Sequence, residues 1–144
     1  SIMAEANYMY DSDLVFKAAG LIAASAAVAT VVDVGAAKVK GELVIDVTAL
    51  EIATNDEIYE IVLQGTNTAA FATDTAIYDL ITLRLGAAEV QTTDCNADNA
   101  TGRYIVPFTN EFNGTNFRYL RLYTIVTGTI ATGINYKAYA SVAK

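Results

Sequence analysis

Apolar and polar side chains alternate along several short stretches of the chain, and this period of two predicts β-strands. The clearest alternation spans residues 42–50, and two further stretches span residues 57–65 and 77–86. The positions predicted to face the core in these stretches are Leu43, Ile45, Val47 and Ala49, then Tyr59, Ile61 and Leu63, then Ile81, Leu83 and Leu85. Turn-forming Gly, Asn, Asp and Thr residues separate the stretches. The pattern therefore predicts an all-β chain folded as an antiparallel, jelly-roll-like β-sandwich.

Residues 115–144 contain two more apolar-rich runs, which flank a loop at residues 127–133 and predict two strands joined as a hairpin. In the first run, Leu120, Leu122 and Val126 share the face that we expect to pack on the core. The opposite face gathers tyrosines around an arginine and comprises Phe117, Tyr119, Arg121, Tyr123 and Ile125. Because such a composition is typical of interfaces, we predict that this face, apart from Ile125, lies at a subunit contact. The alternative is an ordinary tyrosine-rich surface.

Two turn signals shape the stretch before these runs. Pro107 lies within a predicted strand at residues 103–109, and because proline has no N–H this strand should be an edge strand or end there. Asn113-Gly114 is the strongest hairpin signal in the chain, and it predicts a tight turn between the 103–109 strand and the run after it.

The N-terminal part of the chain is apolar without a polar face. Residues 18–32 carry no charge and are rich in alanine, but this stretch is shorter than the roughly 20 residues that a membrane-spanning helix needs. We predict an extended arm at residues 1–27 and a β-sandwich domain at 28–144, with a strand near residues 28–34. The arm is expected to lie on a neighbouring subunit through Leu14, Val15, Phe16, Leu21 and Ile22.

Composition excludes several classes of function. Of the 144 residues 53% are hydrophobic and only 17% are charged, which suits either a well-buried domain or a subunit that covers surface against neighbours. The net charge of −7 argues against nucleic acid and anionic membranes as partners. There is no histidine, and the single cysteine cannot form an intrachain disulfide. We therefore predict no metal and no cofactor.

The residues that usually perform catalysis are also missing. Without histidine, a Ser-His or Cys-His pair is impossible. Glu57 or Asp46 could pair with Glu60 as in a glycosidase, but each fits the solvated face of a strand better, so we do not expect an enzyme. Residues 94–98 start like a calcium loop but lack its glycine and its closing glutamate, so a polar turn is the preferred interpretation.

Most of the chain resembles the capsid cement, or decoration, proteins of tailed bacteriophages. The segments that carry the resemblance are Asp13-Leu14-Val15-Phe16, Val31-Val32-Asp33-Val34-Gly35, Leu43-Val44-Ile45-Asp46-Val47, Tyr59-Glu60-Ile61-Val62-Leu63-Gln64-Gly65-Thr66 and Arg118-Tyr119-Leu120-Arg121-Leu122-Tyr123. The resemblance implies a β-sandwich subunit that sits as a homotrimer on the outer surface of the virion. It would clamp neighbouring major capsid proteins after the head expands, without catalytic residues. On that basis we predict that Phe117, Tyr119, Arg121 and Tyr123 lie at a threefold contact, and that the arm contacts a neighbouring subunit or a capsid protein.

A second class of function stays open at this point. Exposed tyrosines on a sheet face could stack against sugars, so the alternative is a carbohydrate-binding β-sandwich domain. The absence of tryptophan argues against that alternative.

Overall fold

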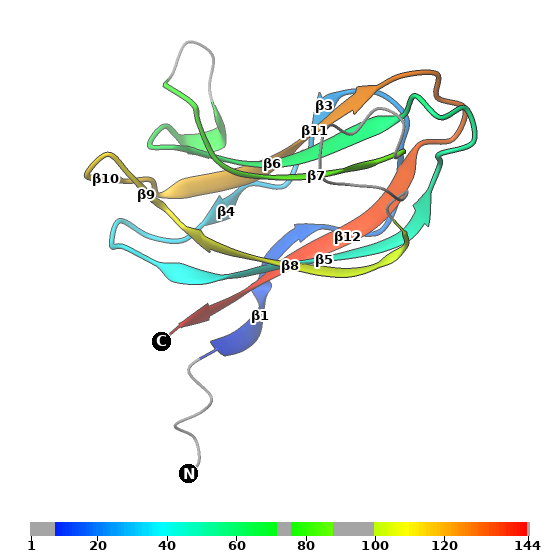
Figure 1. The fold of residues 1–144 in the computed structure, drawn as a ribbon. Helices are drawn as coiled ribbons and strands as arrows, with labels where there is room; N and C mark the ends of the chain where they lie inside the picture. The colour runs from blue at the N-terminus through cyan, green and yellow to red at the C-terminus, as the bar shows by residue number, and fades with distance from the viewer. Residues whose placement is uncertain (1–7, 72–75, 88–99, 144) are drawn as a thin grey trace.

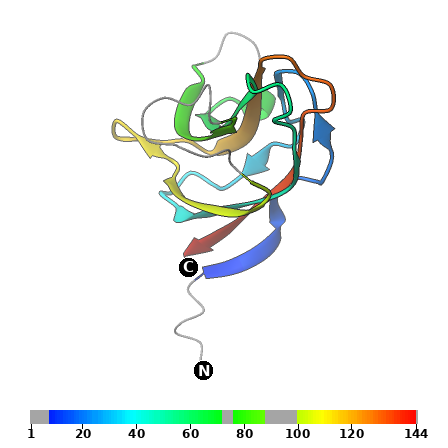
Figure 2. The same ribbon diagram turned by 45° about the vertical axis from the view of Figure 1, so that its right-hand side comes forward.

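The computed structural model describes residues 8–71, 76–87 and 100–143, which form a sandwich of two antiparallel sheets (Figures 1 and 2). The first sheet has the order β1 (Tyr8–Lys17), β12 (Ile134–Ala143), β5 (Lys40–Leu50) and β8 (Gly102–Thr109), with β2 (Leu21–Ile22) also paired to β12. The second sheet has the order β3 (Ala26–Ala27), β11 (Tyr119–Thr127), β6 (Ile58–Thr66) and β7 (Tyr78–Gly86), with β4 (Val32–Asp33) also paired to β11. The antiparallel sandwich predicted from the sequence is confirmed.

The core lies between the two sheets and follows the predicted alternation. Leu43, Ile45 and Val47 of β5 face Tyr59, Ile61 and Leu63 of β6 across one shared cluster, and each is at most 3% exposed. Fully burying such a side chain stabilises the fold by about 1.5–3 kcal/mol. A buried hydrogen bond crosses this core, because the hydroxyls of Thr124 on β11 and Tyr136 on β12 lie 2.6 Å apart.

The hairpin predicted for residues 115–144 is wrong. β11 pairs with β6 in the second sheet, and β12 pairs with β5 in the first, so the loop between them crosses from sheet to sheet. Gly128 and Gly133 bound this loop with positive φ angles of 106° and 88°. A glycine-bounded loop of this length permits either a hairpin or a crossover. Here β11 forms its longest pairing with β6 and β12 forms its longest pairing with β5, so the two strands do not pair with each other.

Residues 8–27 do not form an arm that lies away from the domain's own core. β1 pairs with β12, and its side chains Leu14 and Phe16 are 8% and 0% exposed within the core cluster. The chain then adds β2 to the edge of β12 and β3 to the edge of β11, so it passes from the first sheet to the second. An open strand edge offers unpaired N–H and C=O groups, and this segment satisfies them. Residues 1–7 of the predicted arm lie outside the described residues.

The strand predicted near residues 28–34 is shorter than expected. Only Val32–Asp33 is strand (β4), while Val28 and Val34 each donate one backbone hydrogen bond to β11 or the residue before it. A register shift in β1 between Val15 and Lys17 turns Lys17 inward. The Lys17 ammonium donates to the carbonyl oxygens of Ala18, Gly20 and Tyr136, and burial lowers its pKa.

The edge strand and the tight turn predicted before β11 are both present, but the turn does not join β8 and β11 as a hairpin. β8 holds Pro107 and lies at the edge of the first sheet. Asn113 and Gly114 adopt φ angles of 52° and 84°, as a two-residue hairpin turn requires, and they join β9 (Glu111–Phe112) to β10 (Thr115–Asn116). This small ribbon is a sheet of its own, and it leads from β8 in the first sheet to β11 in the second.

Candidate functional site

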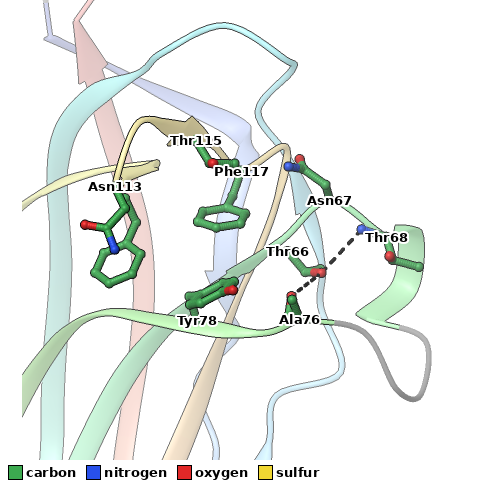
Figure 3. A pocket seen from close by; sticks show the side chains of 9 residues that line it. Thr66, Asn67, Thr68, Ala76, Tyr78, Asn113, Thr115 and Phe117 are labelled. Atoms are coloured by element: carbon green, nitrogen blue, oxygen red, sulfur yellow. Dashed lines mark hydrogen bonds between the residues drawn. The ribbon is translucent and has the colours of Figure 1, made fainter.

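A pocket of about 330 Å³ opens where the β9–β10 ribbon meets the end of β6 and the start of β7 (Figure 3). Its described lining is Thr66, Asn67, Thr68, Ala76, Tyr78, Phe112, Asn113, Thr115 and Phe117. None of these lining residues is charged. The mixture of aromatic rings with amides and hydroxyls is typical of pockets that bind small molecules. We call this feature the end pocket.

Three aromatic rings form the apolar part of the end pocket. The Phe117 ring stacks on the Tyr78 ring with centroids 5.2 Å apart, and Phe112 lies 5.5 Å from Tyr78 on a tilted plane. Phe117 is 4% exposed, whereas Tyr78 is 41% and Phe112 is 38% exposed. Gly65 makes room for this arrangement, because a Cβ there would lie 3.0 Å from the Cβ of Phe117. The buried ring therefore supports two rings that solvent can reach.

In the polar part of the end pocket, hydrogen bonds hold the side chains of Asn67 and Thr66 in place, while other polar groups can still bind a ligand. The Arg118 N–H donates to Asn67 Oδ1 at 2.9 Å, and the Thr66 hydroxyl donates to the Ala76 carbonyl at 2.9 Å. Asn67 Nδ2 and the side chains of Thr68, Asn113 and Thr115 have no hydrogen-bond partner within the described part of the chain. Figure 3 shows Asn67 and Thr68 on one side of the stacked Phe117 and Tyr78 rings and Asn113 on the other, with Thr115 next to Phe117 at the end of the stack.

Only three of the four residues predicted to form the subunit contact lie on one surface of β11. Tyr119, Arg121 and Tyr123 lie half-buried on the outer face of the second sheet. Phe117 does not join them, because it precedes the strand and turns into the core. Arg121 is already engaged within the chain, since its guanidinium lies 4.2 Å from the ring of Phe71 and donates to Gln64 Oε1. Phe71 belongs to a short 3₁₀ turn, η2 (Ala69–Phe71).

The five arm side chains that were predicted to contact a neighbouring protein also differ in their exposure. Leu14 and Phe16 belong to the core, as described above. Val15 is 41% and Leu21 is 58% exposed, so both remain available to a partner, while Ile22 is half-buried beside β12.

An apolar row that the sequence analysis missed crosses the outer face of the first sheet. The strand registers align Val15 on β1 with Tyr139 on β12, Tyr139 with Val44 on β5, and Val44 with Ile105 on β8. Ile105 is 52% exposed, while Val44 is 1% exposed although it points away from the core. We call these four residues the apolar row. The sequence feature that could have indicated this row is Val44, an apolar residue on the otherwise polar face of the strand predicted at residues 42–50.

A charged row lies beside the apolar row. Arg103 Nε donates to Asp46 Oδ1 at 2.8 Å, and the hydrogen bond from Arg103 holds the pKa of Asp46 below its ordinary value. Lys137 is aligned with Asp46 on the neighbouring strand. The apolar row is thus bordered by charges of both signs.

Neither proposed acid pair has the environment of a glycosidase. Asp46 is paired with Arg103, and Glu57 is buried at 0% exposure rather than solvated as predicted. Glu57 accepts hydrogen bonds from the Thr54 N–H and hydroxyl. Burial raises the pKa of Glu57, but these hydrogen bonds outweigh burial and the net pKa is lowered. Both carboxylates therefore have structural partners.

Glu51 and Asp56 hold the loop between β11 and β12. Glu51 accepts hydrogen bonds from the N–H groups of three consecutive loop residues, Ala131, Thr132 and Gly133. Asp56 accepts from the N–H and the hydroxyl of Thr129. The hydrogen bond from the Gly133 N–H is the largest cause that lowers the pKa of Glu51. Both carboxylates therefore have a structural role, because they fix the conformation of the loop that crosses between the sheets.

Among the described residues, no cluster of three or more potential ligands could hold a metal ion. Residues 94–98, considered as a calcium loop, lie outside the described residues. No described helix has the length and apolar character to cross a membrane.

Neither a family model nor a curated protein matches this chain. The class that the fold and its surfaces define is an antiparallel β-sandwich with an uncharged end pocket and an apolar row on one outer sheet face.

Proposed function

We propose that the chain is a structural virion protein, a decoration subunit that binds the outer surface of the major capsid protein lattice and stabilises the expanded head. The proposal also includes assembly as a homotrimer. The observation that carries it is the apolar row on the first sheet. The segments that resemble decoration proteins support it as well.

The apolar row has the make-up of a protein-binding surface. Val15 and Ile105 expose apolar side chains at its two ends, and Arg103 with Asp46 forms a polar border. Interfaces combine an apolar centre with a polar rim in this way. Burying apolar surface is favourable by about 25 cal/mol for each Å². The apolar area that a partner could cover lies mainly on Val15 and Ile105, because Val44 between them is 1% exposed and supports the sheet from within the row.

The proposed threefold contact rests on a narrower set than the sequence analysis gave. Tyr119 and Tyr123 stay on the outer face of the second sheet, opposite the apolar row. Phe117 is removed from the set by its burial, and Arg121 contributes a guanidinium already stacked on Phe71. The two tyrosines are therefore the side chains with which a trimer would be built.

Native mass measurement and electron microscopy test the proposal. The purified chain should be a trimer, and an antibody raised against it should label the outside of phage heads from the source culture. Ile105→Asp should abolish rebinding of the chain to heads from which it has been stripped. Ala36→Asp, in an exposed loop off the sheet face, is the control and should rebind normally. Unlabelled heads, or equal rebinding of both variants, would overturn the proposal.

The tyrosines give a separate test of assembly. Tyr119→Ala combined with Tyr123→Ala should weaken the trimer by about 1–3 kcal/mol, as truncation of central aromatic residues does. Sedimentation equilibrium measures this, and an unchanged trimer affinity would place the contact elsewhere.

A further inference from the structure

We propose that the end pocket binds a neutral sugar, with a pyranose ring held against Tyr78 and Phe112. This site is independent of the proposed capsid role, because it lies at the β9–β10 ribbon and not on the apolar row. It also differs from the sugar site considered from the sequence, which was a tyrosine-bearing sheet face.

The aromatic part of the pocket suits the less polar face of a sugar. A pyranose ring presents C–H groups on one face, and these pack against the face of an aromatic ring. Tyr78 and Phe112 are each more than a third exposed, so their rings are reachable. Phe117 stacks beneath Tyr78 and holds it in place, so little side-chain freedom is lost on binding.

The polar part of the pocket suits sugar hydroxyls, which both donate and accept hydrogen bonds. Asn67 is oriented by the Arg118 N–H, which leaves Nδ2 as a donor. The hydroxyls of Thr68 and Thr115 and the amide of Asn113 can donate or accept. Asn67 and Thr68 lie on one side of the stacked rings in Figure 3 and Asn113 on the other, so a ligand on the rings would meet polar partners at both of its edges.

Charge and size narrow the ligand class further. The described lining has no charged side chain, and the chain carries a net charge of −7, which disfavours anionic ligands such as sialylated or phosphorylated sugars. A volume of about 330 Å³ lies near the lower limit of about 300 Å³ for small-molecule sites. The pocket therefore fits a neutral mono- or disaccharide, or one end of a longer neutral glycan.

Saturation-transfer NMR with the full chain tests this inference. The probes are methyl pyranosides of glucose, galactose, mannose, N-acetylglucosamine, N-acetylgalactosamine and rhamnose, with sialic acid as the anionic comparison. We expect at least one neutral probe to bind and sialic acid not to bind. Titration calorimetry then gives the dissociation constant for the variants.

Three variants connect binding to this pocket. Tyr78→Ala and Phe112→Ala should each weaken binding about tenfold or more, as loss of a central aromatic contact does. Asn67→Asp keeps the acceptor for the Arg118 N–H but removes the Nδ2 donor, so it should also weaken binding by about tenfold. Phe112 and Asn67 lie at exposed positions, so these variants serve if Tyr78→Ala does not fold.

Tyr123→Ala is the matched control, because it removes a tyrosine from the sheet face and leaves the end pocket intact. Its affinity for a monovalent probe should equal that of the unchanged chain. The inference is overturned if no neutral probe binds, if sialic acid binds preferentially, or if binding is lost in Tyr123→Ala but kept in the pocket variants. None of these outcomes depends on whether the chain attaches to capsids.

Discussion

Replacing Phe16 with alanine tests the largest difference between the structure and the sequence analysis. As part of an extended arm, Phe16 would contribute to contacts with a neighbour and little to folding. In the structure it is 0% exposed and packs in the core between the sheets. Phe16→Ala should therefore reduce the free energy of unfolding by about 3–5 kcal/mol, the usual cost of removing a buried phenylalanine.

The adjacent residue provides the control for this experiment. Val15 belongs to the same strand but points to the opposite face and is 41% exposed. Val15→Ala should change the free energy of unfolding by no more than about 0.5 kcal/mol, as surface substitutions do. The two residues are thus neighbours in β1 and differ in the face that they occupy.

Equilibrium unfolding in urea, followed by circular dichroism, measures both variants. Domains of this size have a total stability of about 5–15 kcal/mol, so the Phe16→Ala loss should move the midpoint strongly or unfold the chain outright. Removing residues 1–17 should have an effect at least as large, because it also removes β1, one of the strands paired with β12. If Phe16→Ala and Val15→Ala both change stability by less than about 1 kcal/mol, the N-terminal segment is not part of the core and the extended arm is the better description.

Three further predictions concern the connection between the sheets. Thr124→Val and Tyr136→Phe should each cost about 1–3 kcal/mol in unfolding experiments, but the double variant should cost less than their sum, because each single change leaves a buried hydroxyl unpaired. Burial raises the pKa of Tyr136 from 10.0 to about 12, so the folded state holds the hydroxyl proton more tightly than the unfolded state does. The free energy of unfolding should therefore fall as pH rises from 10 to 12. Thermal unfolding of Tyr136→Phe over this pH range should lack that part of the loss. Gly133→Ala should lower stability by more than about 1–3 kcal/mol, since φ is +88° and the new Cβ would collide with the Ile22 carbonyl oxygen.

The sequence pattern predicts the strands well because each strand buries one face. The alternation in β5, β6 and β7 places Leu43, Tyr59 and Leu85 inward, as observed. Pro107 and Asn113-Gly114 act through local backbone geometry, so an edge strand and a tight turn follow from a few residues alone. These features depend on neighbours along the chain, which a sequence displays directly.

Pairing between distant strands could not be predicted in the same way. The loop at residues 127–133 fits a hairpin as well as a crossover, and only competition from β5 and β6 decides between them. The alanine-rich segment has no alternation because its short strands β2, β3 and β4 serve mainly to cover the edges of β11 and β12. The end pocket was missed for a similar reason, since Asn67, Tyr78 and Phe117 meet only when two sheets and a ribbon are assembled.

The two proposed binding surfaces can be separated by mutation because they occupy different parts of the sandwich. Ile105 lies within β8 on an outer face, whereas Phe112 lies in the ribbon that follows β8. A subunit that places the first sheet on a lattice would keep the end pocket at its rim rather than beneath it. Ile105→Asp should therefore abolish attachment to heads and leave sugar affinity unchanged, while Tyr78→Ala should do the reverse. If one variant removes both activities without unfolding the chain, the two surfaces form a single site, and the division between a lattice-binding face and a sugar-binding pocket is wrong.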